Sequence, residues 1–448
     1  MQTIGAARRA LAEGRMSARA LAEAALARAQ DKAGEGARTF TRLYADGAVH
    51  AADSVDSLAK AGGTPAPLAG IPVSIKDLFD VAGETTLAGS VALKSAPPSA
   101  ADAVIVRRLR AAGAVLVGKT NMTEFAFSGL GLNPHYGTPA SPWDRKTRRI
   151  PGGSSSGAGV SVADGMALAA IGTDTGGSVR IPAAFNGVVG FKPTARRVPT
   201  AGCFPLSSTL DSIGPLAPSV ACCALVDAVM AGEEPLPLPQ RPLAGLRFAL
   251  PQRYVLDGLD AAVSAAYARA LSRLSAAGAR LVELPLAELE DIPRIMAKGA
   301  LVTVEAFAVH RKLLEAAGAK YDPRVASRIR LGANAAAADY YDMLRQRDQL
   351  VARVSRITAD YDALLCPTVA IAAPAIAPLE RDDELYVKTN LAVLRNTTAF
   401  NFLDRCAASL PIHRPGEAPV GLMVVGEPLA DRALLGIAAA IEAALASD

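Results

Sequence analysis

The chain has 448 residues, of which 51% are hydrophobic, enough to bury a large core. Its 47 basic and 43 acidic residues leave a net charge of +4, too near balance to favour a nucleic-acid partner. No apolar run approaches the ~18 residues that a membrane helix needs, so the sequence predicts a cytoplasmic protein that binds no membrane.

Two elements are predicted in the first 80 residues. Apolar residues at helical spacing predict a helix over 17–30, and Ser17 is placed to cap its N-terminus. Residues 70–75, GIPVSI, predict a short strand. Lys76 follows directly, so we expect it at a strand end near the rim of a sheet.

The next predicted unit is a helix and strand that overlap a nucleotide-binding motif. A helix over 102–112 is expected to stop at Gly113, and residues 114–117 to form a buried strand. Residues 113–120, GAVLVGKT, match the P-loop pattern letter for letter. A P-loop needs a strand before its first glycine and a helix at its lysine, and here that order is reversed. We therefore expect no nucleotide site.

The same helix–strand unit recurs later in the chain. A helix over 261–277, a stop at Gly278 and a strand over 280–284 are predicted. The proline-rich segment 233–243 is interpreted as a surface connection, because helix–strand units continue beyond it. This alternation predicts an α/β fold with a mixed sheet.

The cysteines and histidines argue against a disulfide framework and a metal centre. Five cysteines are an odd number and none forms a CxxC pair, which suits a reducing compartment. The four histidines are scattered and no HExxH motif occurs, so a metal-dependent hydrolase is not expected.

Residues 151–194 carry the main functional signal. They contain two glycine pairs that each lead into serine, GGSSS at 152–156 and GGS at 176–178. Glycine lets backbone amides approach a ligand, and a serine after such a run can be a nucleophile whose neighbouring N–H groups hold an oxyanion. On their own, such runs are more often plain loops.

A base for such a serine is not found nearby. No histidine lies in this stretch, so a Ser-His-Asp relay is not indicated. Lys76 is a candidate, because burial at the end of an apolar strand would lower its pKa from the usual value of about 10.4. By position alone, a lysine there is more often on the surface.

Eight segments together resemble the amidase signature family. In chain order they are LAGIPVSIKD (68–77), GKTNMTEFA (118–126), PGGSSSGAG (151–159), GTDTGGSVRIPAAFNGVVGFKPT (172–194), TLDSIGPLAPSV (209–220), YDALLCPT (361–368), RNTTAFNFLDRCAASLP (395–411) and PVGLMVVG (419–426). Residues of about 233–350 match least well. The resemblance implies one domain over 1–448, with a catalytic core of about 68–220 and a central mixed sheet covered on both faces by helices.

The family's catalytic unit is Ser-cisSer-Lys. Carried over to this chain, the nucleophile falls on Ser178, the bridging serine on Ser154 and the base on Lys76. In the family the bridging serine follows a cis peptide bond, which would here join Gly153 to Ser154. The resemblance assigns the oxyanion to four backbone N–H groups, those of Thr175, Gly176, Gly177 and Ser178.

Further residues receive supporting roles by the same resemblance. Asp174 and Arg180 flank the GGS turn and are expected to brace it, with an ordinary surface ion pair as the alternative. Ala126 is expected to line the acyl pocket and contact substrate, and Ser155 to contact substrate and hydrogen-bond near Ser178, with a plain loop serine as the alternative for Ser155. Cys203 is interpreted as a small buried residue rather than a nucleophile.

The resemblance implies an amidohydrolase that cleaves the C–N bond of a small linear carboxamide through a serine acyl-enzyme. It would release a carboxylate and ammonia or an amine, and it needs no cofactor. The alternative is the amidase component of a tRNA-dependent glutaminyl/asparaginyl amidotransferase, which passes ammonia to a partner. An inactive scaffold is disfavoured by the complete Ser-Ser-Lys set. Homodimers are common in the family, but the sequence sets neither the oligomeric state nor the acyl group.

Overall fold

One sheet of eleven strands runs through the computed structural model, which describes residues 1–446. In chain order the strands are β1 Phe40–Leu43, β2 Pro72–Lys76, β3 Val115–Thr120, β4 Ala169–Thr173, β5 Val189–Lys192, β6 Ile213–Ala217, β7 Arg247–Pro251, β8 Arg280–Leu284, β9 Ala363–Pro367, β10 Ala407–Pro411 and β11 Gly421–Val425. Their order across the sheet is β1-β3-β2-β4-β6-β5-β10-β11-β9-β7-β8. Strands β3, β2 and β4 are parallel, as are β9, β7 and β8, and the other pairs are antiparallel. The predicted mixed sheet is confirmed.

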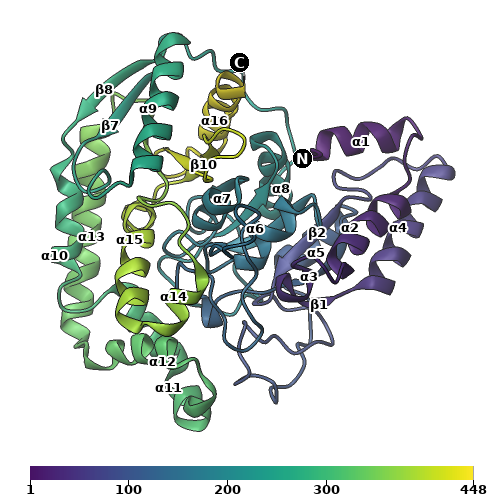
Figure 1. Ribbon diagram of the computed structural model, residues 1–448, viewed down its shortest axis with the longest axis horizontal. Coiled ribbons are helices and arrows are strands. Elements are labelled where there is room, and N and C mark those ends of the chain that lie inside the picture. The colour runs from purple at the N-terminus through teal and green to yellow at the C-terminus, as the bar shows by residue number, and fades with distance from the viewer. Residues whose placement is uncertain (447–448) are drawn as a thin grey trace.

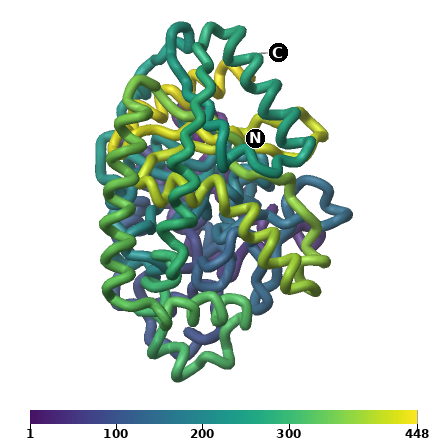
Figure 2. The backbone as a smooth tube through the Cα atoms, turned by 90° about the vertical axis from the view of Figure 1, so that its left-hand side faces the viewer, coloured from purple at the N-terminus to yellow at the C-terminus, as the bar shows by residue number. Residues whose placement is uncertain are grey.

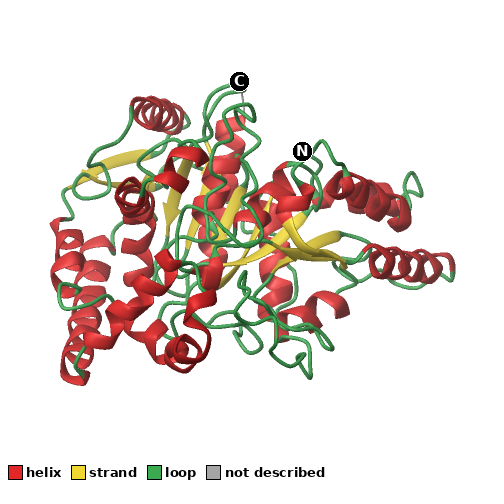
Figure 3. Ribbon diagram, turned by 60° about the horizontal axis from the view of Figure 1, so that its bottom comes forward, coloured by secondary structure: helices red, strands yellow, loops and turns green. Residues whose placement is uncertain are grey.

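Helices lie on both sides of this sheet (Figures 1 and 3). They are α1 Ile4–Ala12, α2 Ala18–Gln30, α3 Gly36–Thr39, α4 Ala45–Lys60, α5 Val104–Ala111, α6 Ser156–Ala163, α7 Arg180–Asn186, α8 Val220–Ala231, α9 Ala261–Ala276, α10 Asp291–Ile295, α11 Leu301–Ala317, α12 Pro323–Arg330, α13 Ala337–Thr358, α14 Ile376–Arg381, α15 Asp383–Phe402 and α16 Asp431–Ala446. Short 3-10 turns occupy Glu124–Ala126, Ala287–Glu290, Gly318–Lys320 and Leu331–Asn334. None of the helices within 1–446 has the length and apolar character to cross a lipid bilayer.

Strand β10 shows how the sheet separates two apolar layers. Its Ala408 and Leu410 belong to the cluster that contains Leu434 of α16. The alternate residue, Ala407, belongs to a second cluster with Phe400 of α15. Because successive side chains of a strand point to opposite faces, a sheet covered on both faces needs apolar residues at consecutive positions. This explains why central strands such as β11, whose sequence is GLMVV, are apolar at consecutive positions.

Residues 291–358 form a helical layer, α10 to α13, on the side of the molecule away from α1, α2 and α4 (Figures 1 and 2). The layer is joined to the sheet through the second apolar cluster, where Ile292 of α10 and Leu350 of α13 pack with Met423 of β11. It lies inside 233–350, apart from its last turns, and therefore in the part of the chain with the weakest resemblance to the family.

Most of the predicted elements are confirmed, with small changes at their ends. Ser17 caps α2 by accepting the N–H of Ala20 at 3.0 Å. Strand β8 has the predicted bounds, and Gly113 follows α5 in a left-handed conformation with a φ of +81°. Strand β3 is longer than expected and runs on to Thr120, because it pairs with both β1 and β2. Lys119 is therefore a strand residue, and the segment does not have the loop and helix that a P-loop places at its lysine.

Candidate active site

Lys76 and Ser154 are in direct contact at the carboxyl end of β2. Lys76 is the last residue of this strand, and its Nζ donates to Ser154 Oγ at 2.7 Å and to Thr173 Oγ1 at 2.8 Å. Thr173 ends the parallel neighbour β4, so two adjacent strand ends fix the amine. The Gly153–Ser154 peptide bond is cis in the structure.

Burial controls the protonation of Lys76. The side chain has no exposed surface, and this desolvation lowers the pKa of Lys76 to about 7. Cys203, Asp211 and Asp174 act in the opposite direction and favour the ammonium form. Since burial is the stronger influence, the amine is largely neutral above pH 7.

Asp174 organises the loop that joins β4 to α7. Its Oδ1 accepts the N–H of Gly177 at 2.8 Å, and its Oδ2 accepts the N–H of Val179 at 3.2 Å. Arg180 donates two hydrogen bonds to the same carboxylate, from Nε to Oδ2 at 3.0 Å and from Nη2 to Oδ1 at 2.9 Å. Asn401 adds a further donor to Oδ1 at 2.9 Å. The pair is fully buried, so it is not a surface ion pair.

Arg180→Met is expected to lower the free energy of unfolding by about 3–5 kcal/mol, because it leaves the Asp174 carboxylate buried without its counter-charge. Urea denaturation of the purified variant measures this change. The matched control is Arg145→Met, which removes a partly exposed ion pair in which Arg145 Nη2 bonds to both carboxylate oxygens of Asp164. That change should amount to less than about 1 kcal/mol. Equal effects of the two substitutions would contradict the role of the buried pair.

Ser178 lies in the same loop and lines a cavity of about 470 Å³. Its carbonyl accepts the N–H of Ser155 at 3.3 Å, which ties the two serine loops together. Among residues 1–446, no hydrogen bond joins the hydroxyls of Ser178 and Ser154, so the link between the two loops is made by the backbone. Ser178 faces the cavity, while Lys76 and Ser154 are fully buried and do not line it.

The backbone amides around Ser178 divide into two groups. Thr175, Gly176 and Ser178 line the cavity, and their N–H groups have no acceptor within the described chain. Gly177 does not line it, and its N–H is directed to Asp174. The expectation that Gly177 donates to an oxyanion is therefore corrected.

Gly177 is required for a different reason, which is steric. Its φ is +130°, and a Cβ atom there would lie 2.1 Å from Thr397 Oγ1. The Thr397 hydroxyl donates to the carbonyl of Gly176 at 2.6 Å, and Thr398 does so at 3.1 Å. Helix α15 thus holds the loop in place through its two threonines.

The two predicted substrate contacts differ in their placement. Ala126 lines the cavity. Ser155 does not, because its hydroxyl donates to the carbonyl of Thr173 at 3.3 Å. The expectation for Ser155 is corrected from substrate contact to a contact between the serine loop and β4. Cys203 packs against the core but is half-buried rather than buried as expected, and desolvation raises the pKa of its thiol.

Several residues of the site were not singled out from the sequence. Asp211 accepts the Thr175 hydroxyl at 2.5 Å, and burial raises the pKa of this carboxyl group. Thr173 holds the lysine, and Asn401 holds Asp174. Each stands inside or next to a matched segment, such as GTDTGGS or RNTTAFNF. Their position in the matched segments could have pointed to these residues. The residue type alone, however, does not reveal what a hydroxyl, amide or carboxyl group does in the site.

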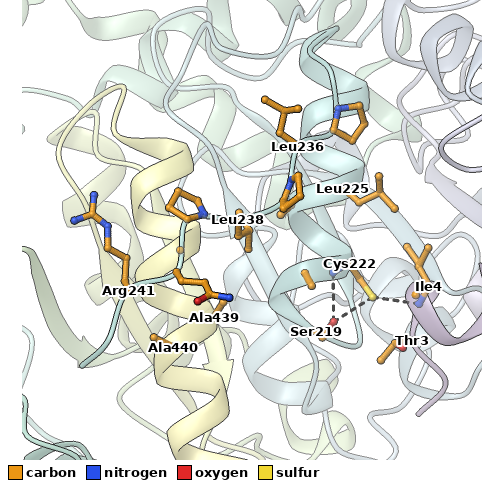
Figure 4. A pocket seen from close by; sticks show the side chains of 18 of the residues that line it. Thr3, Ile4, Ser219, Cys222, Leu225, Leu236, Leu238, Arg241, Ala439 and Ala440 are labelled. Carbon is orange, nitrogen blue, oxygen red and sulfur yellow. Dashed lines mark hydrogen bonds between the residues drawn. The ribbon is translucent and has the colours of Figure 1, made fainter. Parts of the chain in front are cut away.

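A second cavity, of about 1010 Å³, lies between α1, α8, α16 and the proline-rich segment (Figure 4). Of the described residues that line it, none is Asp, Glu, His or Lys. Ser219 and Cys222 line it too, but Ser219 Oγ caps α8 and Cys222 Sγ accepts the N–H of Ile4 at 3.2 Å. This cavity offers no general base, so the cavity at Ser178 is the stronger candidate for the active site.

Known proteins share this fold over nearly its full length. The family described as Amidase matches residues 20–435. The 2-amino-5-chloromuconic acid deaminase of Comamonas testosteroni is 39% identical over 397 residues, which cover 88% of this chain and 85% of that protein. The A-type subunit of the glutamyl-tRNA(Gln) amidotransferase of Chloroflexus aggregans is 34% identical, with 97% and 94% covered. A crystal structure of an amidase superposes with a TM-score of 0.89 at 34% identity and covers 99% of both chains. The chain therefore belongs to the amidase signature family and is a hydrolase of amide C–N bonds.

Proposed function

We propose that this enzyme hydrolyses a small linear carboxamide through an acyl-enzyme on Ser178, with Lys76 as the base and Ser154 as the bridge between them. The observation that carries the proposal is the contact of 2.7 Å between Lys76 Nζ and Ser154 Oγ, behind a serine that faces a cavity. An ammonium group has three donors and no acceptor. The lowered pKa of Lys76 therefore supports the role, because the neutral amine can accept a proton.

The reaction follows from these positions. Neutral Lys76 accepts the proton of Ser154, which in turn accepts the proton of Ser178, and Ser178 Oγ attacks the amide carbon. The N–H groups of Thr175, Gly176 and Ser178 stabilise the oxyanion. The proton returns through Ser154 to the leaving nitrogen, ammonia or an amine departs, and water hydrolyses the acyl-enzyme. Asp174 and Arg180 position the loop without touching the substrate.

The second candidate function is the amidase component of a tRNA-dependent amidotransferase, which the Chloroflexus aggregans relative favours. We expect the purified chain alone to release ammonia from simple amides in a library screened by a coupled ammonia assay, with Ser178→Ala as the inactive control. Release that begins only when partner proteins and a charged tRNA are added would support the second candidate instead.

The proposed partner is thus a small-molecule amide rather than a nucleic acid or a membrane. The five cysteines are free thiols, which supports a reducing compartment such as the cytoplasm. Homodimers are common in the family, so size-exclusion chromatography of the purified chain should test for one.

A further inference from the structure

The cavity at Ser178 has an uneven distribution of charge. Two arginines, Arg328 of α12 and Arg395 of α15, contribute to its wall. Of the described residues that line it, none is Asp or Glu. Much of the remaining wall is apolar, including Leu210, Met296 and Phe402. The space next to the nucleophile is therefore apolar with a positive potential.

Arg328 is a guanidinium without a counter-ion. It donates one hydrogen bond, from Nη1 to the carbonyl of Phe127 at 2.5 Å, and lies over the Phe127 ring at 4.5 Å from its centroid. Desolvation lowers the pKa of Arg328, and no carboxylate of residues 1–446 lies within 4.0 Å of it. An arginine has five N–H donors in a fixed fork, and four of those of Arg328 have no acceptor within residues 1–446.

Its neighbour in the same helix shows the contrast. Arg324 stacks on Tyr386 at 4.6 Å from the ring centroid and also pairs with Asp383. Arg328 stacks on an aromatic ring in the same way but lacks the carboxylate. Arg328 is half-buried, so water reaches part of its guanidinium in the free protein, and a substrate carboxylate that replaced this water would supply the counter-charge that Arg324 already has.

Arg395 is held more firmly by the protein itself. Its Nη2 donates to the carbonyl of Asp257 and its Nε to Asn396 Oδ1 at 3.2 Å. It too has no carboxylate within 4.0 Å in the described part of the chain, so it adds positive potential to the cavity. Two of its three guanidinium nitrogens already have acceptors, which leaves Arg328 as the better ligand for an anion.

We propose that the substrate is an amide that also carries a carboxylate, joined to the amide by an apolar skeleton, and that Arg328 binds this carboxylate. The proposal rests on the proposed function for the position of the amide at Ser178. Arg–carboxylate pairs form two parallel hydrogen bonds, which give both affinity and orientation. The carboxylate end would fix the substrate, and the apolar wall would accept its skeleton.

The test uses matched ligands and does not depend on turnover. The probes are succinamate, glutaramate and adipamate, each compared with a neutral analogue in which a methyl ketone replaces the carboxylate. Binding to the Ser178→Ala protein is measured by calorimetry, and kcat/KM with the wild type. For the best chain length, we expect the anionic amide to bind at least tenfold more tightly. Equal affinity of every pair would overturn the proposal, whatever the enzyme hydrolyses.

Variants of the two arginines then test which of them binds the substrate carboxylate. Arg328→Met should abolish the preference by raising the KM of the anionic amide at least tenfold, while the neutral analogue changes little. Arg328→Lys should restore part of it, and the exposed Arg330→Met on the same helix should preserve it. Loss of the preference in Arg395→Met but not in Arg328→Met would overturn the role of Arg328. Anion-selective binding that depends on Arg328, without any amide hydrolysis, would support the carboxylate site at Arg328 but contradict the proposed function.

Discussion

Ser178→Ala is expected to lower kcat for amide hydrolysis by a factor on the order of 10⁵ to 10⁶, the loss typical of a serine hydrolase without its nucleophile. The variant should also resist covalent labelling by a small alkyl fluorophosphonate. The physical reason is that Ser178 is the serine that both lines the cavity and has cavity-facing amides beside it. Ammonia release and intact-protein mass spectrometry measure the two effects.

The control is Ser128→Ala, which removes another hydroxyl from the wall of the same cavity. Ser128 Oγ donates to Asn390 Oδ1 at 2.9 Å and accepts the N–H of Leu130 at 3.2 Å, and no lysine or histidine of residues 1–446 is hydrogen-bonded to it. The fluorophosphonate should therefore still label this variant, on the peptide that contains Ser178. Normal labelling of Ser178→Ala would show that another residue is the nucleophile.

The elements near the sheet were predictable because local patterns and tertiary packing agree there. The helix of 17–30 has a capping serine, and the strand of 280–284 has the predicted bounds in the structure. The end of β3 was missed because its length depends on pairing with β1, which follows from no pattern within 114–117. The order of the eleven strands likewise depends on contacts between distant segments, so the sequence alone predicted the class of sheet and not its topology.

The site was predictable in its residue types and less so in its orientations. The matched segments indicated Lys76 and Ser154, and the structure brings these side chains together. The direction of the Gly177 N–H and of the Ser155 hydroxyl depends on the buried carboxylate of Asp174 and on the end of β4. The Gly177 N–H and the Ser155 hydroxyl could each bond to substrate or to an acceptor within the protein. Only the folded geometry decides which of these acceptors each group bonds.

The residues proposed to determine substrate choice were the least predictable from the sequence. Met296 and Arg328 reach the cavity from the helical layer, in the part of the chain with the weakest resemblance to the family. Their side chains have no motif, and an arginine without a partner cannot be told from a paired one until its neighbours are known. Under the two proposals, the chemistry lies on the end of β2 and on the two serine loops, and substrate choice lies on helices that face them.

Lys76→Ala is expected to lower kcat/KM for amides by about 10²–10⁴-fold, the usual contribution of a general base. Ester hydrolysis should fall less, because a leaving nitrogen needs a proton more than an alkoxide does. The wild-type rate should rise with pH up to about 7 and then level off. This sign follows from the pKa of Lys76, since the base is active only as the neutral amine that forms above that pH.

The control for this prediction is Lys192→Ala. Lys192 is also buried at a strand end, and desolvation lowers its pKa to about 8, but its Nζ bonds to the carbonyl of Pro193 and it does not line the cavity. Its removal should leave the rise near pH 7 in place, whereas Lys76→Ala should abolish it. Equal losses on amides and esters, or a rise near pH 7 that survives in Lys76→Ala, would assign the proton transfer to another group. Both lysines are buried, but only Lys76 contacts Ser154. The comparison therefore shows whether the rise near pH 7 needs an amine at this position or only a buried lysine with a lowered pKa.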